Sequence, residues 1–341
     1  MTRISTILLL LMIFGVSCKD KSALKEAEAT QETEVVKEVV ETPKTYAEIS
    51  IAEGGQWIDG PRDHKEYSGG TSFKNVASLK VPEQHTDHSW YIRYEGPGWE
   101  SSKVGYRLYL DWRNAIDIFG KVTDEMVLSQ VGQDGFDSYH ELQSWGMDIL
   151  KAGKSVGIGS LGRYDGKEVL HFNEVDSTFA NVENMANMSV VNVDYFGWKT
   201  MDDKIDLKSQ LSIQPDSRMT KHTMMPSKAI SGICTGIVKF DGIDLIQKES
   251  DTSDWAYIAT YGEQSLVPDN LGMAVFYKKT TVDQVVEGPH DHIVVFKPTT
   301  EAVSFYFLGA WEKEKDGITT KEGFLAYLDG LLSELNNNPL K

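Results

Sequence analysis

From about Ala47 onward, short runs rich in β-branched and aromatic residues recur, bounded by Gly, Asp, Asn and Pro. Such runs, without long helices between them, are typical of antiparallel sheets packed face to face. We therefore predict a mainly-β protein, a large antiparallel β-sandwich with a few peripheral helices. The clearest predicted strands are Ser189–Phe196, Lys204–Ile213, Trp255–Tyr261, Met273–Tyr277, His292–Phe296 and Val303–Phe307.

Two segments have helical spacing instead. Thr319–Glu322 has a capping-box pattern, and the apolar residues after it recur at helical spacing as far as Leu335. This predicts a C-terminal helix that packs on the sandwich. Ser138–Glu141 is a second capping-box pattern, which predicts a short helix ending near Gly153. Its apolar positions are Leu142, Trp145, Ile149 and Leu150.

The N-terminus has the layout of a lipoprotein signal. Arg3 precedes an apolar run, Ile4–Val16, and small residues then lead to Cys18. The run is shorter than the ~20 residues that a membrane-spanning helix needs. We predict a signal peptide over residues 1–17 and lipidation of Cys18, which would anchor the protein to the outer membrane, facing the periplasm or the cell surface. The alternative is a secreted protein without lipid.

Residues 18–46 are rich in Glu, Lys, Thr and Ala, with no aromatic residue before Tyr46. Such a segment cannot bury enough apolar surface to fold alone, so we predict a charged, flexible tether. Residues 47–341 are then one β-sandwich domain, long enough for a sizeable core. Cys234 lies in an apolar stretch and is expected in that core.

The charge balance limits the partners. The chain has 34 basic and 51 acidic residues, a formal net charge of −17. This field repels polyanions, which argues against nucleic acid as a partner. Salt screens it within about 10 Å, so a local cationic site can still capture an anionic sugar.

Residues 90–121 contain the densest chemistry. Along a predicted strand, Lys103–Arg113, alternation places Arg107, Tyr109, Asp111 and Arg113 on one face, opposite Val104, Tyr106, Leu108 and Leu110. Arginine binds carboxylate or sulfate through its planar fork, so substrate-binding candidates are Arg93, Arg107 and Arg113. The alternative is a solvated sheet face on which Arg107 or Arg113 pairs with Asp111 or Asp117.

Four of the eight tryptophans, Trp90, Trp99, Trp112 and Trp145, lie around this segment. Indole faces stack on sugar rings, and we take Trp99 and Trp145 as candidate platforms. Core packing is the alternative for each of them.

Histidines supply two further hypotheses. His85 and His88, like His290 and His292, bring imidazoles close to a carboxylate, which suits a divalent metal as cofactor, whereas the alternative is surface histidines beside turns. The other hypothesis concerns catalysis. His140 or His222 has the pKa range of a general base, and Tyr139 is a candidate acid.

Glu95–Lys121 and Asp134–Gly162 resemble segments of a Bacteroidetes family known as a domain of unknown function, whose members often lie in polysaccharide-utilisation loci. The likeness extends from about residue 48 to the C-terminus. It implies a β-sandwich related to the galactose-mutarotase-like supersandwich of polysaccharide lyases. Because the family includes an ulvan oligosaccharide dehydratase, it also implies loss of water from the unsaturated uronyl end of sulfated algal oligosaccharides.

Three functions therefore remain open from the sequence. The first is the oligosaccharide dehydratase. The second is a polysaccharide lyase or glycoside hydrolase acting on uronic-acid glycans, since His, Tyr and Arg also suit cleavage of glycosidic bonds. The third is a glycan-binding lipoprotein without catalysis.

Overall fold

The computed structural model describes residues 43–61, 63–70, 72–136 and 138–337. By its internal contacts, Thr42–Lys341 forms one unit. The predicted signal peptide, the lipidation of Cys18 and nearly all of the predicted tether lie outside the described residues. Among the residues described, no helix is both long and apolar enough to cross a membrane.

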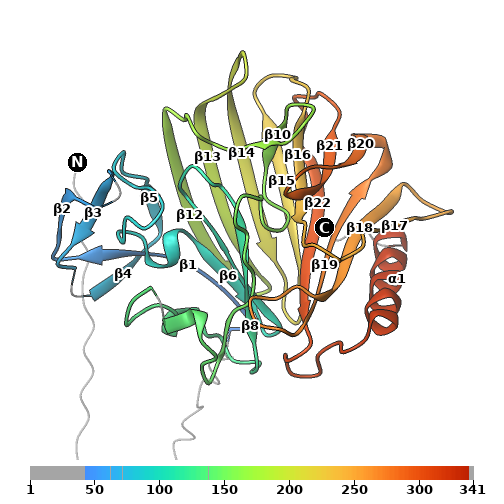
Figure 1. Cartoon of the computed structure of the whole chain (residues 1–341), viewed down its shortest axis with the longest axis horizontal. Coiled ribbons are helices and arrows are strands. Elements are labelled where there is room, and N and C mark those ends of the chain that lie inside the picture. Colours follow the sequence, from blue (N-terminus) through green and yellow to red (C-terminus); the bar gives the residue numbers. More distant parts are fainter. Residues whose placement is uncertain (1–42, 62, 71, 137, 338–341) are drawn as a thin grey trace, which may run out of the picture. The chain divides into compact units, whose positions relative to one another are not determined.

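A nine-stranded antiparallel sheet dominates this unit (Figure 1). Five of the six strands predicted from the apolar runs lie in this sheet, and the sixth lies in a five-stranded sheet described in the next paragraph. The mainly-β prediction is therefore confirmed. In spatial order the nine strands are β17 (Ile246–Glu249), β18 (Trp255–Glu263), β19 (Asn270–Lys278), β22 (Val303–Trp311), β15 (Met219–Pro226), β14 (Asp203–Ile213), β13 (Met188–Thr200), β12 (Ser177–Met185) and β5 (Ser78–Lys80).

Two smaller sheets and a hairpin complete the β-structure. The six-stranded sheet contains, in spatial order, β4 (Ser72–Val76), β1 (Thr45–Glu53), β6 (Gly98–Ser101), β7 (Val104–Leu108), β8 (Ile116–Lys121) and β9 (Gly146–Asp148). The five-stranded sheet contains β11 (Val169–Leu170), β10 (Gly162–Tyr164), β16 (Ile233–Val238), β21 (Asp291–Phe296) and β20 (Val282–Glu287). The hairpin is β2 (Gln56–Asp59) with β3 (Lys65–Ser68), and the short 3₁₀ turns are Arg93–Glu95, Leu128–Gln130, Ser138–His140 and Lys279–Thr281.

The main core lies between the large sheet and the two smaller ones. It joins Ile118 of the six-stranded sheet, Phe307 of the nine-stranded sheet and Val294 of the five-stranded sheet in one buried apolar cluster. Every named strand pair is antiparallel. Along each strand the pleat turns successive side chains alternately toward the core and the opposite face. Cys234 is fully buried on β16, as expected.

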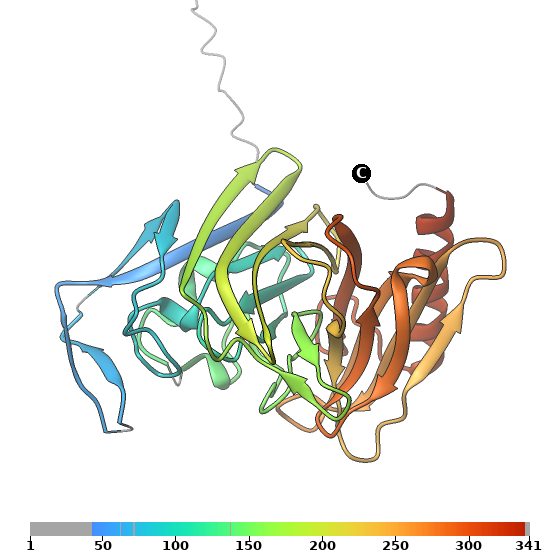
Figure 2. The ribbon, with the colours of Figure 1, turned by 90° about the horizontal axis from the view of Figure 1, so that it is seen from above.

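Helix α1 (Lys321–Asn337) covers part of the other face of the large sheet (Figures 1 and 2). Its buried residues pack against strands β18, β19 and β22. The predicted C-terminal helix is therefore confirmed, and so is its packing against the sandwich. The leucine stripe forms this contact: Phe324, Leu328, Leu332 and Leu335 are all buried.

The second predicted helix is wrong. Ser138–His140 forms a single 3₁₀ turn, Leu142 is exposed in a turn, and the chain then enters strand β9. Gly146 explains the change, because its φ of 134° is open only to glycine and a Cβ there would lie 1.8 Å from Gly120 O. After it, Met147 and Ile149 enter the core while Asp148 points to the opposite face, which is strand periodicity.

The six-stranded sheet turns an unusually polar face away from the core. Arg107 on β7, Asp117 on β8 and Asp148 on β9 lie on this outer face, and all three are buried. The segment 122–145 covers them with a small apolar cluster that includes Val131 and Tyr139. A charged strip is thus enclosed between a sheet and a covering loop.

Candidate functional site

Arg107 is the centre of the enclosed strip. Its Nη2 lies 2.9 Å from Asp117 Oδ2 and 2.6 Å from Asp148 Oδ2, and its Nη1 donates to the Tyr139 hydroxyl at 3.0 Å. The register of β7 and β8 places Arg107 directly opposite Asp117. Tyr109, the first residue after the strand, also accepts from Arg107 and donates to Asp117. The guanidinium is therefore bonded on several sides by protein groups.

Burial shifts the pKa values of two groups that contact Arg107. It raises the pKa of Asp148 well above the ordinary value for an aspartate, with the Arg107 guanidinium opposing the rise and Asp117 adding to it. Burial also raises the pKa of Tyr139, again opposed by Arg107. A hydroxyl held protonated in this way can donate a proton but does not exist as a phenolate at neutral pH.

Arg113 reaches the same network from a turn. The predicted strand ends at Leu108, and Asn114, with φ 44°, closes a turn by donating to Asp111 O at 3.1 Å. Arg113 therefore lies beyond the strand. Its side chain folds back over the Tyr109 ring, 3.8 Å from the centroid.

The contacts of Arg113 join the turn to the network. Its Nη2 lies 2.5 Å from Asp111 Oδ2 and 2.9 Å from Glu95 Oε1, and its Nη1 lies 3.1 Å from Asp87 Oδ1. Glu95 in turn lies 3.9 Å from Arg107. The ion pairs that the sequence offered as the alternative, Arg107–Asp117 and Arg113–Asp111, are both formed. The first is buried and the second is partly buried, so neither lies on a solvated sheet face.

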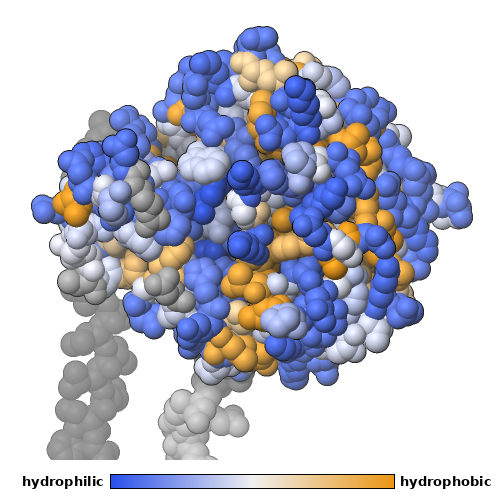
Figure 3. All heavy atoms as spheres, in the orientation of Figure 1, coloured by the Kyte–Doolittle hydropathy of each residue, from blue (hydrophilic) through white to orange (hydrophobic). Residues whose placement is uncertain are grey.

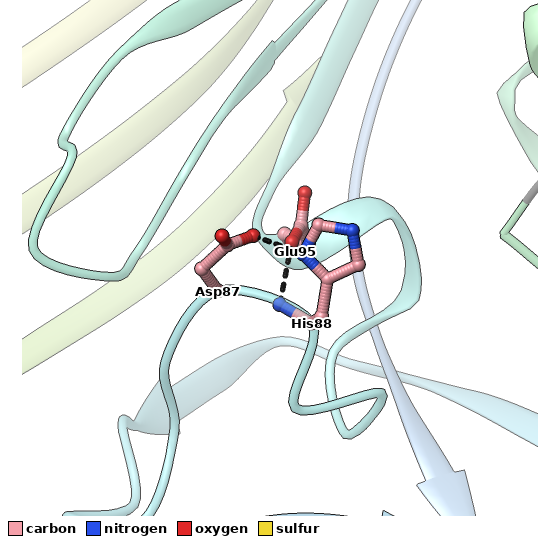
Figure 4. Close-up of side chains that lie close together, drawn as sticks. All are labelled: Asp87, His88 and Glu95. Carbon is pink, nitrogen blue, oxygen red and sulfur yellow. Dashed lines mark hydrogen bonds and ion pairs between the residues drawn. The ribbon is translucent and has the colours of Figure 1, made fainter. Parts of the chain in front are cut away.

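The loop before β6 has a strained backbone. His88, Trp90, Tyr94 and Glu95 all have positive φ, at 59°, 62°, 43° and 71°. Non-glycine residues in this region cost energy and persist where the surroundings hold them, often at functional sites. Here they bring Asp87, His88 and Glu95 together (Figure 4).

Two cavities lie on either side of this loop. The smaller, of about 310 Å³, is lined by Trp90, Glu95, Phe136 and Tyr139 among others, and Arg93 forms part of its wall. The larger, of about 610 Å³, is lined by residues that include His85, Asp111 and Trp112. Because Arg113 pairs with Asp111 and with Glu95, it connects a wall of one cavity to a wall of the other.

Tyr139 lines the smaller cavity, and the His140 ring lies beside the Tyr139 ring. Their ring centroids are 4.6 Å apart, and Phe136 contacts both rings. The His140 side chain is 32% exposed, and its Nε2 lies 3.6 Å from Asp148 Oδ2. The structure thus brings together a partly exposed imidazole, a protonated tyrosine and the arginine network.

The prediction of a positively charged pocket needs correction. Arg93 and Arg107 are both buried, and Arg93 pairs with Glu48. Arg107 and Arg113 share a network with five carboxylates: Glu95, Asp87, Asp111, Asp117 and Asp148. Arg107 is therefore not available to bind a substrate directly, because protein groups hold its fork. Arg113 is the arginine with partial exposure, at 14% of its side chain.

The prediction of which tryptophans could contact a sugar also needs correction. Trp99 is fully buried, donates to Thr220 and stacks on Tyr106, and Trp145 packs edge-on against Phe119. Both belong to apolar clusters and present no face to a sugar. The tryptophans that line the two cavities beside this loop are instead Trp90 and Trp112, the latter 42% exposed. Core periodicity does not reveal them, since both lie in loops.

His222 is a core histidine and not the predicted base. Strand β15 places it against Phe305, with Nε2 bonded to Ser209 and Nδ1 2.8 Å from Gly159 O. Burial lowers its pKa to about 4, with the Gly159 carbonyl opposing the shift. In the part of the chain that the structure describes, neither its hydrogen bonds nor its ring contacts reach the arginine network.

This burial predicts a pH-dependent stability. Because the folded-state pKa of His222 lies below its unfolded value, its neutral form contributes stability above pH ~6.5, and this is lost as pH falls toward 4. The expected loss is about 3 kcal/mol in the free energy of unfolding. Urea unfolding between pH 4 and 7 measures it. His222→Gln should flatten this part of the profile, whereas Phe305→Leu, which loosens the same packing, should keep it. Equal slopes in the wild type and His222→Gln would refute the assignment.

Of the four histidines predicted as metal ligands, one lies in a group of possible ligands in the structure. His88 lies in a group with Asp87 and Glu95 whose donor atoms are all within 4.8 Å of one another. His85 is outside this group, because its Nδ1 bonds to Ser89. Within the described ranges, His290 and His292 form no such group, and His290 lies just before strand β21 and not on it. Glu95 is the member of this group that spacing in the sequence did not identify as a candidate metal ligand.

The chain matches, over residues 21–341, the family described as "Domain of unknown function (DUF4861)". It belongs to this family. No curated protein matches the chain. A solved structure of a candidate aldose 1-epimerase from Klebsiella pneumoniae subsp. pneumoniae is similar at 8% identity and a TM-score of 0.38, covering 87% of this chain and 97% of the other. Similarity at this level does not transfer an activity.

Proposed function

We propose that this protein is a dehydratase that eliminates water from the unsaturated uronyl end of ulvan-type sulfated oligosaccharides. The observation that carries the proposal is the pair Tyr139–His140, in which Tyr139 lines a cavity with several aromatic residues and accepts a hydrogen bond from Arg107. A neighbouring acid and base beside a cavity with aromatic and polar walls suit an elimination reaction on a sugar. The resemblance of Glu95–Lys121 and Asp134–Gly162 to the dehydratase family supports the same reaction.

The roles follow from the contacts. His140 removes a carbon-bound proton, the electron pair forms the new double bond, and the carbon–oxygen bond to the leaving hydroxyl breaks. Tyr139 protonates that hydroxyl, so water leaves and atoms and charge balance. Arg113 is partly exposed but paired with Asp111, Glu95 and Asp87, so it would act on the charge of the uronate carboxylate through its own positive charge and not through a free fork. Arg107 donates to Tyr139 and pairs with Asp148, and so positions both reacting side chains.

The aromatic residues would hold the sugar. Trp90 and Phe136 in the smaller cavity, with Trp112 at the larger one, offer ring faces in place of the buried Trp99 and Trp145. Hydrophilic residues dominate the face shown in Figure 3, which suits a water-soluble, anionic oligosaccharide as partner. A lipid on Cys18 would keep the enzyme at the outer membrane, close to lyase products.

Mass spectrometry of a lyase-digested ulvan mixture incubated with the protein tests the function. Dehydration predicts products lighter by one water molecule, with chain length unchanged. Shortened chains would mean that the protein is a polysaccharide lyase or glycoside hydrolase. Retention of oligosaccharide without any product would mean a binding protein. Either of these two results contradicts the proposal.

A further inference from the structure

We propose that Asp87, His88 and Glu95 form a binding site for one divalent transition-metal ion. One imidazole and two carboxylates are the ligand types of zinc and of similar metals, and three protein ligands leave a position open for water or substrate. The close-up in Figure 4 shows the three side chains converging from two neighbouring stretches of the same loop. The inference does not depend on the dehydration reaction.

The distances suit such a site. The candidate donor atoms all lie within 4.8 Å of one another. Ligand atoms around a tetrahedral zinc ion lie about 3.3 Å apart, given bonds of about 2.0–2.1 Å. Small side-chain rotations therefore close the group around an ion. The His88 backbone N–H already donates to Glu95 Oε1 at 3.0 Å, which fixes one ligand against another.

An orphaned oxygen points to a missing partner. Glu95 is 2% exposed, and its Oε2 has no hydrogen-bond donor, although its other oxygen is bonded to Arg113 and His88. A buried carboxylate oxygen without a donor is costly. The Arg107 guanidinium lies 3.9 Å from Oε2, beyond hydrogen-bond distance. In Figure 4 the Glu95 oxygen bonded to His88 faces the group, so a rotation of the carboxylate would bring Oε2 to an ion held with Asp87 and His88.

The charge balance points the same way. The linked network contains five carboxylates and two guanidinium groups. Burial raises the pKa of Asp148, and even with that group protonated the carboxylates outnumber the guanidinium groups by two. Most of these groups are buried, where uncompensated charge is expensive. A divalent ion would offset this excess. Arg113 would remain paired with Asp111 beside the ion, since it bonds that carboxylate through both Nε and Nη2.

Calorimetric titration of the chelator-treated full chain with Zn²⁺ tests the site. We expect one ion per chain with micromolar affinity or tighter, and a melting temperature that rises by several degrees. His88→Asn, chosen because asparagine tolerates the positive φ of this position, should weaken binding at least about tenfold. Glu95→Gln, which keeps shape and removes charge, should do the same.

The control is His290→Ala, which changes the other predicted histidine pair and should leave the affinity unchanged. The site assignment is wrong if the wild type takes up no Zn²⁺, or if His290→Ala weakens binding while His88→Asn and Glu95→Gln do not. Stronger binding of Ca²⁺ or Mg²⁺ than of Zn²⁺ or Mn²⁺ would overturn the transition-metal assignment. Because binding is read without substrate, a failed dehydration assay leaves this result intact.

Discussion

Replacing Arg107 by methionine should lower the free energy of unfolding by about 3–5 kcal/mol. The side chain is 2% exposed and is the shared cation of Asp117 and Asp148, which are buried equally deeply. Without the guanidinium, two carboxylates and the Tyr139 hydroxyl lose a donor and remain away from water. Removing one member of a buried charge network costs far more than removing a surface pair.

Urea denaturation of matched variants measures this effect. Arg107→Lys keeps the charge but loses the planar fork, so its stability should fall between those of the wild type and Arg107→Met. Lys199→Met is the surface control, because Lys199 pairs with Glu174 in solvent, and it should change stability little. If Arg107→Met is as stable as Lys199→Met, Arg107 is not the organising cation of the strip.

Much of the fold follows from periodicity in the chain. The six apolar runs are strands because each buries one face in the core between sheets. Period-two alternation also placed Arg107 and Tyr109 opposite Tyr106 and Leu108 correctly, and these four residues divide between the polar strip and the core. The C-terminal helix follows equally directly from its capping box and leucine spacing.

The predicted helix after Ser138 fails because two patterns compete in the same residues. Leu142, Trp145 and Ile149 fit helical spacing, but Met147, Asp148 and Ile149 also fit a strand. Pairing with β8 and the positive φ of Gly146 decide for the strand. The alternation around Asp148 is the signal that could have identified this aspartate as a partner of Arg107.

The remaining site residues depend on tertiary contacts that spacing does not encode. Glu95 receives His88 and Arg113 only because a strained loop folds back on a turn. Trp90 and Trp112 lie in loops, where no periodicity separates an exposed ring from a buried one. His222, by contrast, lies within a strand that alternates buried and more exposed positions, a signal that the prediction of a base at His222 did not take into account.

We propose that water elimination occurs at Tyr139 and His140. The most direct test is the initial rate of water loss from unsaturated ulvan oligosaccharides, followed by mass spectrometry for the wild type, His140→Ala and His64→Ala. His64 lies beside Glu66, away from the network residues, and serves as the matched control. The account predicts a rate about 10²–10⁴-fold lower for His140→Ala and an unchanged rate for His64→Ala. Full turnover by a folded His140→Ala variant would contradict it.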